Sequence, residues 1–167
     1  NFTLFEKVSV PFTAVITQQD KNLSHGLDRF SQPFNQFGLS PKYKWLTLHG
    51  GYRSMEFSEY TLSGTIFLGG GIEVNPAKGI ISGSAMYGRF VKAVPKGGVD
   101  EIVVSLPAYE RTGGGGMIRL GKNAHMVDLI FLKIKHDIFS IPFDSTVVFT
   151  PHENQIIAFR TRQRLSS

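Results

Sequence analysis

Cysteine is absent from the 167-residue chain, and its absence excludes disulfides, thiolate metal sites and cysteine nucleophiles together. Long apolar runs are absent too, because no stretch approaches the roughly 18 consecutive apolar residues of a transmembrane helix. Long stretches of helix-forming residues are few. A helical membrane protein and a disulfide-stapled scaffold are therefore both excluded.

The composition favours strands and turns instead. Fourteen Phe and five Tyr accompany eighteen Gly and eight Pro; aromatic residues favour strands, whereas Gly and Pro favour turns. A hydrophobic content of 41% predicts one folded unit rather than a disordered segment. The net charge of +5 suits an anionic partner such as nucleic acid, lipopolysaccharide or an acidic substrate, and suits a mildly basic soluble surface equally well.

From residue 43 onward, apolar and polar side chains alternate with the period of two that indicates β-strands. Residues 1–42 are predicted to be irregular, with one short strand possible at residues 11–18, and residues 101–107 could be a short strand or an ordered loop. The long strands that we predict cover residues 43–56, 61–74, 80–94, 109–121, 125–137 and 155–165. Turns such as NPAKG at residues 75–79 join them. We therefore predict an all-β protein in which residues 43–167 form the hairpins of an antiparallel up-and-down meander.

A soluble sandwich and an outer-membrane β-barrel both fit this alternation. The strand expected from Thr61 would span about 40 Å, which is enough to cross a bilayer at a tilt. In such barrels the apolar side chains face lipid and the polar ones line the lumen. The residues that we predict to face lipid are Leu46, Leu48, Leu62, Ile66, Leu68, Ile72, Val74, Ile157, Phe159 and Leu165. The residues that we predict to line the lumen are Thr61, Thr65, Glu73, Arg111, Arg119, Arg160, Arg162 and Arg164. Phe67 falls on the lumen side of this pattern and needs a packing partner.

Three arginines alternate along the last predicted strand, at Arg160, Arg162 and Arg164. In an extended chain they share one face. An arginine facing lipid at mid-membrane costs about 2–4 kcal/mol, so this face must meet water or a polar lumen. The alternative is the solvated face of a soluble edge strand, where basic residues discourage aggregation.

Several blocks of the sequence together resemble a known family. They are PFNQFGLSPKYKWLTLHGGYRSMEFSEYTLSGTIFLGGGIEVNP, SAMYGRFVKAV, YERTGGGG, VDLIFLKIKHD and TPHENQIIAF. Their order is similar to that of the first barrel hairpins of a large, mostly uncharacterised outer-membrane β-barrel family of Bacteroidota, over about residues 33–165. The resemblance implies a transmembrane β-barrel in the cell outer membrane, in contact with outer-membrane lipid and with other envelope proteins or the rest of its own barrel.

We expect the chain to be part of a larger barrel. Six or seven long strands are fewer than the eight or more of bacterial single-chain barrels, and an open sheet edge in lipid would leave backbone groups unpaired. The signal for barrel assembly is usually a C-terminal strand whose last residue is aromatic, and this sequence has no such strand.

No enzymatic chemistry is predicted. The five histidines are too dispersed for a metal site, no G-x-S-x-G elbow occurs, and the glycine runs GGGIEV and GGGGMIRL match neither phosphate-binding loop pattern. These runs lie inside predicted strands, where glycine usually allows a bend or a close approach, here of a plug, a lipid or a partner. Nucleic acid is not expected, because the arginine face of the last strand has no aromatic platform.

We therefore expect no cofactor and no metal. The predicted function is that of an outer-membrane barrel protein, a structural or transport component of an envelope complex, whose arginine-lined lumen would favour anions. The alternative is a soluble all-β ligand-binding module.

Overall fold

In the computed structural model, residues 2–4, 8–15, 36–94, 97–99, 102–105, 107–122, 125–141 and 152–163 are described. All regular elements in these ranges are β-strands. They are β1 (Phe2–Leu4), β2 (Val8–Val10), β3 (Phe12–Val15), β4 (Gln36–Leu39), β5 (Lys42–Tyr43), β6 (Leu46–Ser54), β7 (Ile66–Val74), β8 (Ile81–Val91), β9 (Gly97–Val99), β10 (Ile102–Ser105), β11 (Glu110–Lys122), β12 (His125–Asp137) and β13 (Glu153–Gln163).

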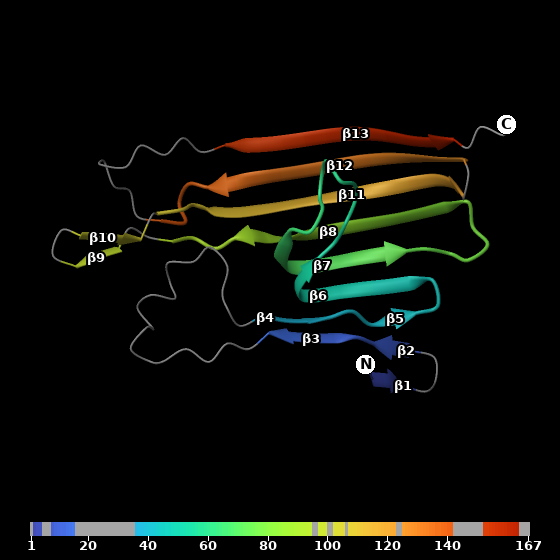
Figure 1. Ribbon diagram of the computed structural model, residues 1–167, viewed down its shortest axis with the longest axis horizontal. Helices are drawn as coiled ribbons and strands as arrows, with labels where there is room; N and C mark the ends of the chain where they lie inside the picture. The colour runs from blue at the N-terminus through green and yellow to red at the C-terminus, as the bar shows by residue number, and fades with distance from the viewer. Residues whose placement is uncertain are drawn as a thin grey trace.

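Eleven of these strands form one antiparallel sheet, shown in Figure 1. Its order is β1-β2-β5-β6-β7-β8-β11-β12-β13, and β4 pairs with both β3 and β6. Strands β9 and β10 form a separate hairpin. The predicted all-β antiparallel meander is confirmed. Within the described residues the sheet is open, with β1 and β3 at one edge and β13 at the other. No helix in these ranges is long and apolar enough to cross a membrane.

Two predicted element boundaries are wrong. Strand β7 begins at Ile66 and not at residue 61, because residues 55–65 leave the sheet. The segment before residue 43 contributes four short strands and part of β5 to the sheet, where only one short strand was expected. Each is paired, β1 with β2 and β3 with β4, so short strands that periodicity overlooks are stabilised by backbone pairing.

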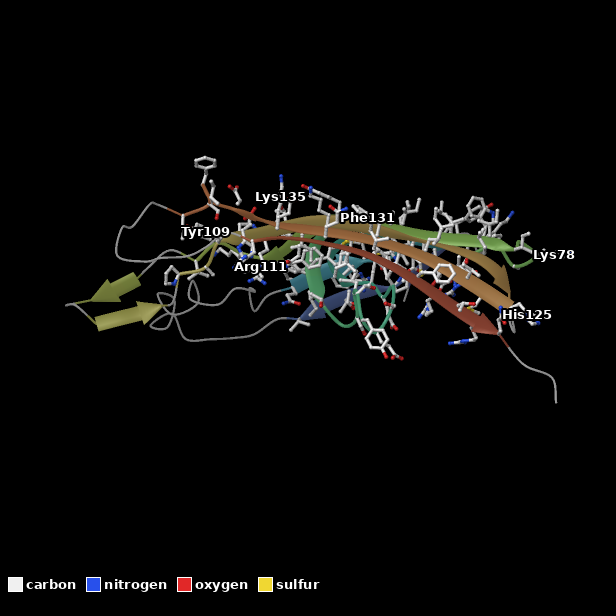
Figure 2. The ribbon with its side chains drawn as sticks, turned by 90° about the horizontal axis from the view of Figure 1, so that it is seen from above. Lys78, Tyr109, Arg111, His125, Phe131 and Lys135 are labelled. Carbon is white, nitrogen blue, oxygen red and sulfur yellow. The ribbon has the colours of Figure 1, made fainter. Side chains whose placement is uncertain are left out.

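The sheet is curved and therefore has a convex and a concave face (Figure 2). Figure 2 shows Phe131 and Lys135 on the convex side. Because directly paired residues in an antiparallel sheet lie on the same face, the register extends this assignment to the other strands. Phe131 pairs with Gly116 and Ile157, which places those two residues on the convex face as well.

The convex face carries a continuous zone of apolar side chains across β6, β7, β8, β11, β12 and β13, which we call the apolar belt. It consists of Leu46, Leu48, Ile72, Val74, Ile81, Ala85, Ile118, Leu120, Val127, Leu129, Phe131, Ile157 and Phe159. Most of the larger side chains in it are exposed. At one end of the strands the belt gives way to a polar border of Arg89, Glu110, Thr112, Lys133, Lys135, Glu153 and Gln155.

The connections differ between the two ends of the sheet. At the end that carries the β9–β10 hairpin (left in Figure 1), they span residues 16–35, 55–65, 92–109 and 138–152. At the opposite end they span only residues 5–7, 44–45, 75–80 and 123–124. The strand ends at the first end, the loop end, are thus joined by long stretches of sequence, and those at the second, the turn end, by short ones.

Candidate functional site

Residues 55–65, the connection between β6 and β7, lie against the concave face, and we call them the inward loop. Phe57 is 1% exposed and Leu62 is 2% exposed. Together with Met55 they pack on a cluster of strand residues, namely Phe67, Met86, Phe90, Ile130 and Leu132. The buried core of the described residues is therefore formed between the concave face and this loop.

Backbone hydrogen bonds give the inward loop its compact shape. The Phe57 N–H donates to the carbonyl oxygen of Leu62 at 2.9 Å, and the Thr61 N–H donates to that of Ser58 at 3.2 Å. The hydroxyl oxygens of Ser58 and Thr61 lie 2.8 Å apart. The tight turn closed by these bonds presents Phe57 and Leu62 to the sheet.

Five glycines stand side by side beneath this core, and we call them the glycine row. Direct pairing runs through Gly38, Gly51, Gly69, Gly88 and Gly113 on five neighbouring strands. A Cβ at Gly69 would lie 2.1 Å from the carbonyl oxygen of Tyr87, and one at Gly88 would lie 2.8 Å from the ring of Phe67. Glycine here allows strongly curved strands to approach and leaves room for Phe67.

The glycine row explains how Phe67 obtains the packing partner that the alternation pattern requires. Its side chain is 0% exposed. Its ring centre lies 5.9 Å from that of Phe90, and the inward loop covers both rings. Beside it, the sulfur of Met55 lies where a Cβ of Gly71 would be, at 2.4 Å. The sheet thus carries glycine, which has no side chain, at positions where Met55 of the loop and Phe67 need space.

Asp128 joins three strands on the concave face near the turn end. Its carboxylate is 0% exposed and accepts hydrogen bonds from Arg119 Nε at 2.7 Å and Nη2 at 3.1 Å. Arg160 donates to it through Nε at 2.8 Å and also through Nη2. Losing one partner of such a buried cluster costs about 3–5 kcal/mol. The cluster therefore fixes the register of β11, β12 and β13, and it cannot face lipid.

A cleft of about 290 Å³ opens between the inward loop and this end of the concave face. Its lining residues come from the loop and from β7, β8, β11, β13 and the turn after β7. They are Glu56, Phe57, Glu73, Val74, Asn75, Ser82, Gly83, Ser84, Met117, Arg119 and Arg160. Carboxylates, guanidinium groups and hydroxyls thus surround one small space.

His49 extends the polar surface from Glu73 towards β4. Its Nδ1 lies 2.7 Å from the hydroxyl oxygen of Ser40, and its Nε2 lies 3.4 Å from Oε1 of Glu73. Ser40 is buried. The row of serine, histidine and glutamate resembles a nucleophile with its base, but the residues that line the cleft do not include Ser40 or His49. We assign this row a structural role.

The predicted site residues divide between the two faces. On the concave face lie Glu73, Arg111, Arg119, Arg160 and Arg162. On the convex face lie Leu46, Leu48, Ile66, Leu68, Ile72, Val74, Ile157 and Phe159. Arg164 and Leu165 lie outside the described residues.

Three predicted site residues belong to the inward loop rather than to a strand. Leu62, expected on the same face as Ile66, is instead buried against the concave face. Thr61 and Thr65, expected on a strand, lie in the loop as well. The expectation was wrong because Leu62 and Ile66 are four residues apart, which an unbroken strand would place on one face. The chain instead enters the sheet only at Ile66, so the alternation does not extend back to Leu62.

Sequence reasoning missed Asp128, Ser84 and Glu56. A signal for Asp128 was available, since a lone carboxylate in the apolar stretch HMVDLIFL requires a cationic partner when it is buried. Ser84 and Glu56 had no comparable signal, because they meet only through the fold of the inward loop. Within the described residues no group of histidine, aspartate and glutamate could hold a metal ion.

Comparison with protein-family models, curated proteins and solved structures finds no match for this chain. The features of the molecule that bear on its function are the two faces of the sheet and the inward loop.

Proposed function

We propose that this chain is part of the wall of an outer-membrane β-barrel, a structural or transport component of the cell envelope. The apolar belt would face lipid and the concave face would face the lumen. This is also the arrangement that the sequence resemblance to a barrel family of Bacteroidota implies.

The observation that carries this proposal is the apolar belt. A soluble sheet rarely exposes so many large apolar side chains on one continuous face, whereas an outer-membrane barrel requires such a band. The polar border contains the ion pairs Lys133–Glu153 at 2.5 Å and Arg89–Glu110 at 3.4 Å. Such charges suit the level of lipid headgroups and of water.

The unequal connections support the same proposal. Outer-membrane barrels have short turns on the periplasmic side and longer loops on the extracellular side. The turn end would then be periplasmic and the loop end extracellular. The inward loop would be an extracellular connection that folds back between the walls of the barrel.

The concave face supports a lumen of mixed charge rather than the arginine-dominated one expected from sequence. Asp128 neutralises part of the charge of Arg119 and Arg160, and Glu56 and Glu73 lie nearby. The inward loop fills part of this side of the sheet. We therefore propose a partly plugged lumen, without a general preference for anions.

One pair of variants tests the membrane assignment. Phe131→Arg puts a charge in the middle of the apolar belt and should cost about 2–4 kcal/mol in a bilayer. It should lower the fraction of folded protein recovered from the outer membrane after alkaline extraction. Lys133→Arg, on the same strand and face, is the matched control and should leave that fraction unchanged.

A soluble all-β ligand-binding module is the second candidate, and the cleft on the concave face favours it. In that case Phe131→Arg would act at a solvent-exposed position and change stability by no more than about 0.5 kcal/mol. A monodisperse protein in buffer without detergent, together with a tolerated Phe131→Arg, would reject the membrane proposal.

A further inference from the structure

The cleft beside the inward loop separates charges of opposite sign on its lining. Glu56 from the inward loop and Glu73 from β7 supply carboxylates, while Arg119 from β11 and Arg160 from β13 supply guanidinium groups. Strand β8 lies between β7 and β11 in the sheet. A molecule in this cleft therefore meets negative charge towards β7 and positive charge towards β11 and β13.

The two arginines keep donors for a ligand. Asp128 accepts two N–H groups from each of them. A guanidinium carries five N–H donors in a fixed fork. Asp128 therefore orients both groups and reduces their summed charge without using all of their donors.

Ser84 lies on β8 and is one of the residues that line the same cleft. Its hydroxyl oxygen is buried and has no hydrogen-bond partner in the described part of the chain. On either side Ser84 pairs with Glu73 and Met117. A buried polar group without a partner costs about 1–3 kcal/mol, so a ligand towards which this side chain rotates to form a hydrogen bond would gain free energy.

We propose that this cleft binds a small zwitterion, a molecule with one ammonium and one carboxylate group such as a free amino acid. The carboxylate would accept hydrogen bonds from Arg119 and Arg160, the ammonium would donate to Glu73 and Glu56, and Ser84 would bond the ligand between them. The volume of about 290 Å³ lies just below the range of about 300–1,000 Å³ for drug-sized ligands, which suits a smaller molecule. The inference goes beyond the membrane assignment, because the charged residues of the cleft lie on the inward loop and on the concave face, away from the apolar belt.

Binding is measured on the purified protein by isothermal titration with glycine, β-alanine and γ-aminobutyrate, which differ in charge separation. Acetate and methylammonium are the single-charge probes. We expect at least one zwitterion to bind about tenfold more tightly than either single-charge probe, since it satisfies both sets of charges. Equal affinity for acetate and for all zwitterions, or no binding of any zwitterion, would overturn the proposal.

Two variants locate the site. Glu73→Gln removes one anionic partner and should weaken zwitterion binding about tenfold while leaving acetate binding unchanged. Ser84→Ala should weaken it severalfold. The matched control is Glu59→Gln, which removes a carboxylate from the inward loop at an exposed position outside the lining. Equal effects of Glu73→Gln and Glu59→Gln would reject the site, and would leave the outcome of the Phe131→Arg test unaffected.

Discussion

Single glycines decide whether the strands can curve beneath the inward loop. In the glycine row, Gly69 sits where a Cβ would come 2.1 Å from the carbonyl oxygen of Tyr87. Gly69→Ala must therefore displace the backbone of β8. We expect it to lower the free energy of unfolding by about 2–3 kcal/mol, as overpacking of a rigid site does. Urea unfolding of the folded protein, followed by the fluorescence of the single tryptophan, measures the change.

Gly70→Ala is the matched control for this prediction. Gly70 is the next residue on the same strand, it is exposed, and the nearest atom to its Cβ position is the carbonyl oxygen of His49 at 3.5 Å. Alanine in a strand is slightly favoured over glycine by backbone entropy, so stability should stay equal or rise. Equal losses in the two variants would show that crowding on the concave face is not the cause.

At the level of elements, the inward loop is held mainly by the burial of Phe57 and Leu62. Removing the Phe57 ring leaves a cavity in this core, and Phe→Ala changes in cores cost about 3–5 kcal/mol. Because residues 55–65 lie outside the strands, we expect Phe57→Ala to open the loop before it unfolds the sheet. Cleavage by a glutamate-specific protease at Glu56 and Glu59 should accelerate about a hundredfold.

Tyr60→Ala is the control for the loop, since Tyr60 is 91% exposed and lies outside the core cluster of the inward loop. It should leave the cleavage rate unchanged. If Phe57→Ala cleaves no faster than Tyr60→Ala, the loop is not held by its apolar contacts with the sheet.

The inward loop also shows how far the sequence could predict these elements. Alternation identified five of the six long strands, and β12 was identified by its apolar centre between polar ends. Alternation failed at Leu62, because a period of two contains no information about where the backbone turns. Here the chain turns through a bridge between Ser58 and Leu62 and a positive φ of 67° at Gly64. The sequence feature that indicated the inward loop was Phe67, an apolar residue on the polar face of its strand, which needed another segment to pack against it.

The orientation of β12 needed information that no local pattern contains. Its centre, Leu129 to Leu132, is apolar on both faces, so periodicity left its faces undetermined. The register decides the matter by pairing Asp128 with Arg119 on one side and with Arg160 on the other. Register depends on contacts across the sheet and thus on residues far apart in the sequence. For the same reason, the sequence alone could not predict the cluster of Asp128, Arg119 and Arg160 or the cleft.

At the level of the whole molecule, two asymmetries coincide. The convex face is apolar while the concave face carries the loop and the ion cluster, and long connections gather at one end of the sheet. In the proposed barrel the first asymmetry would distinguish the lipid side from the lumen side, and the second would distinguish the outside of the cell from the periplasm. A protein with both should enter a membrane in one orientation only.

That orientation can be measured directly because the chain has no cysteine. Lys78→Cys places a thiol in the exposed turn at the turn end, and Phe139→Cys places one at the loop end, where Phe139 is 89% exposed. In intact cells a membrane-impermeant maleimide should label Phe139→Cys and spare Lys78→Cys. Both should react once the outer membrane is permeabilised. Labelling of Lys78→Cys alone in intact cells would show that the orientation is the opposite of the proposed one. Labelling of neither variant, before or after permeabilisation, would show that neither end of the sheet is exposed to water, which contradicts the proposal.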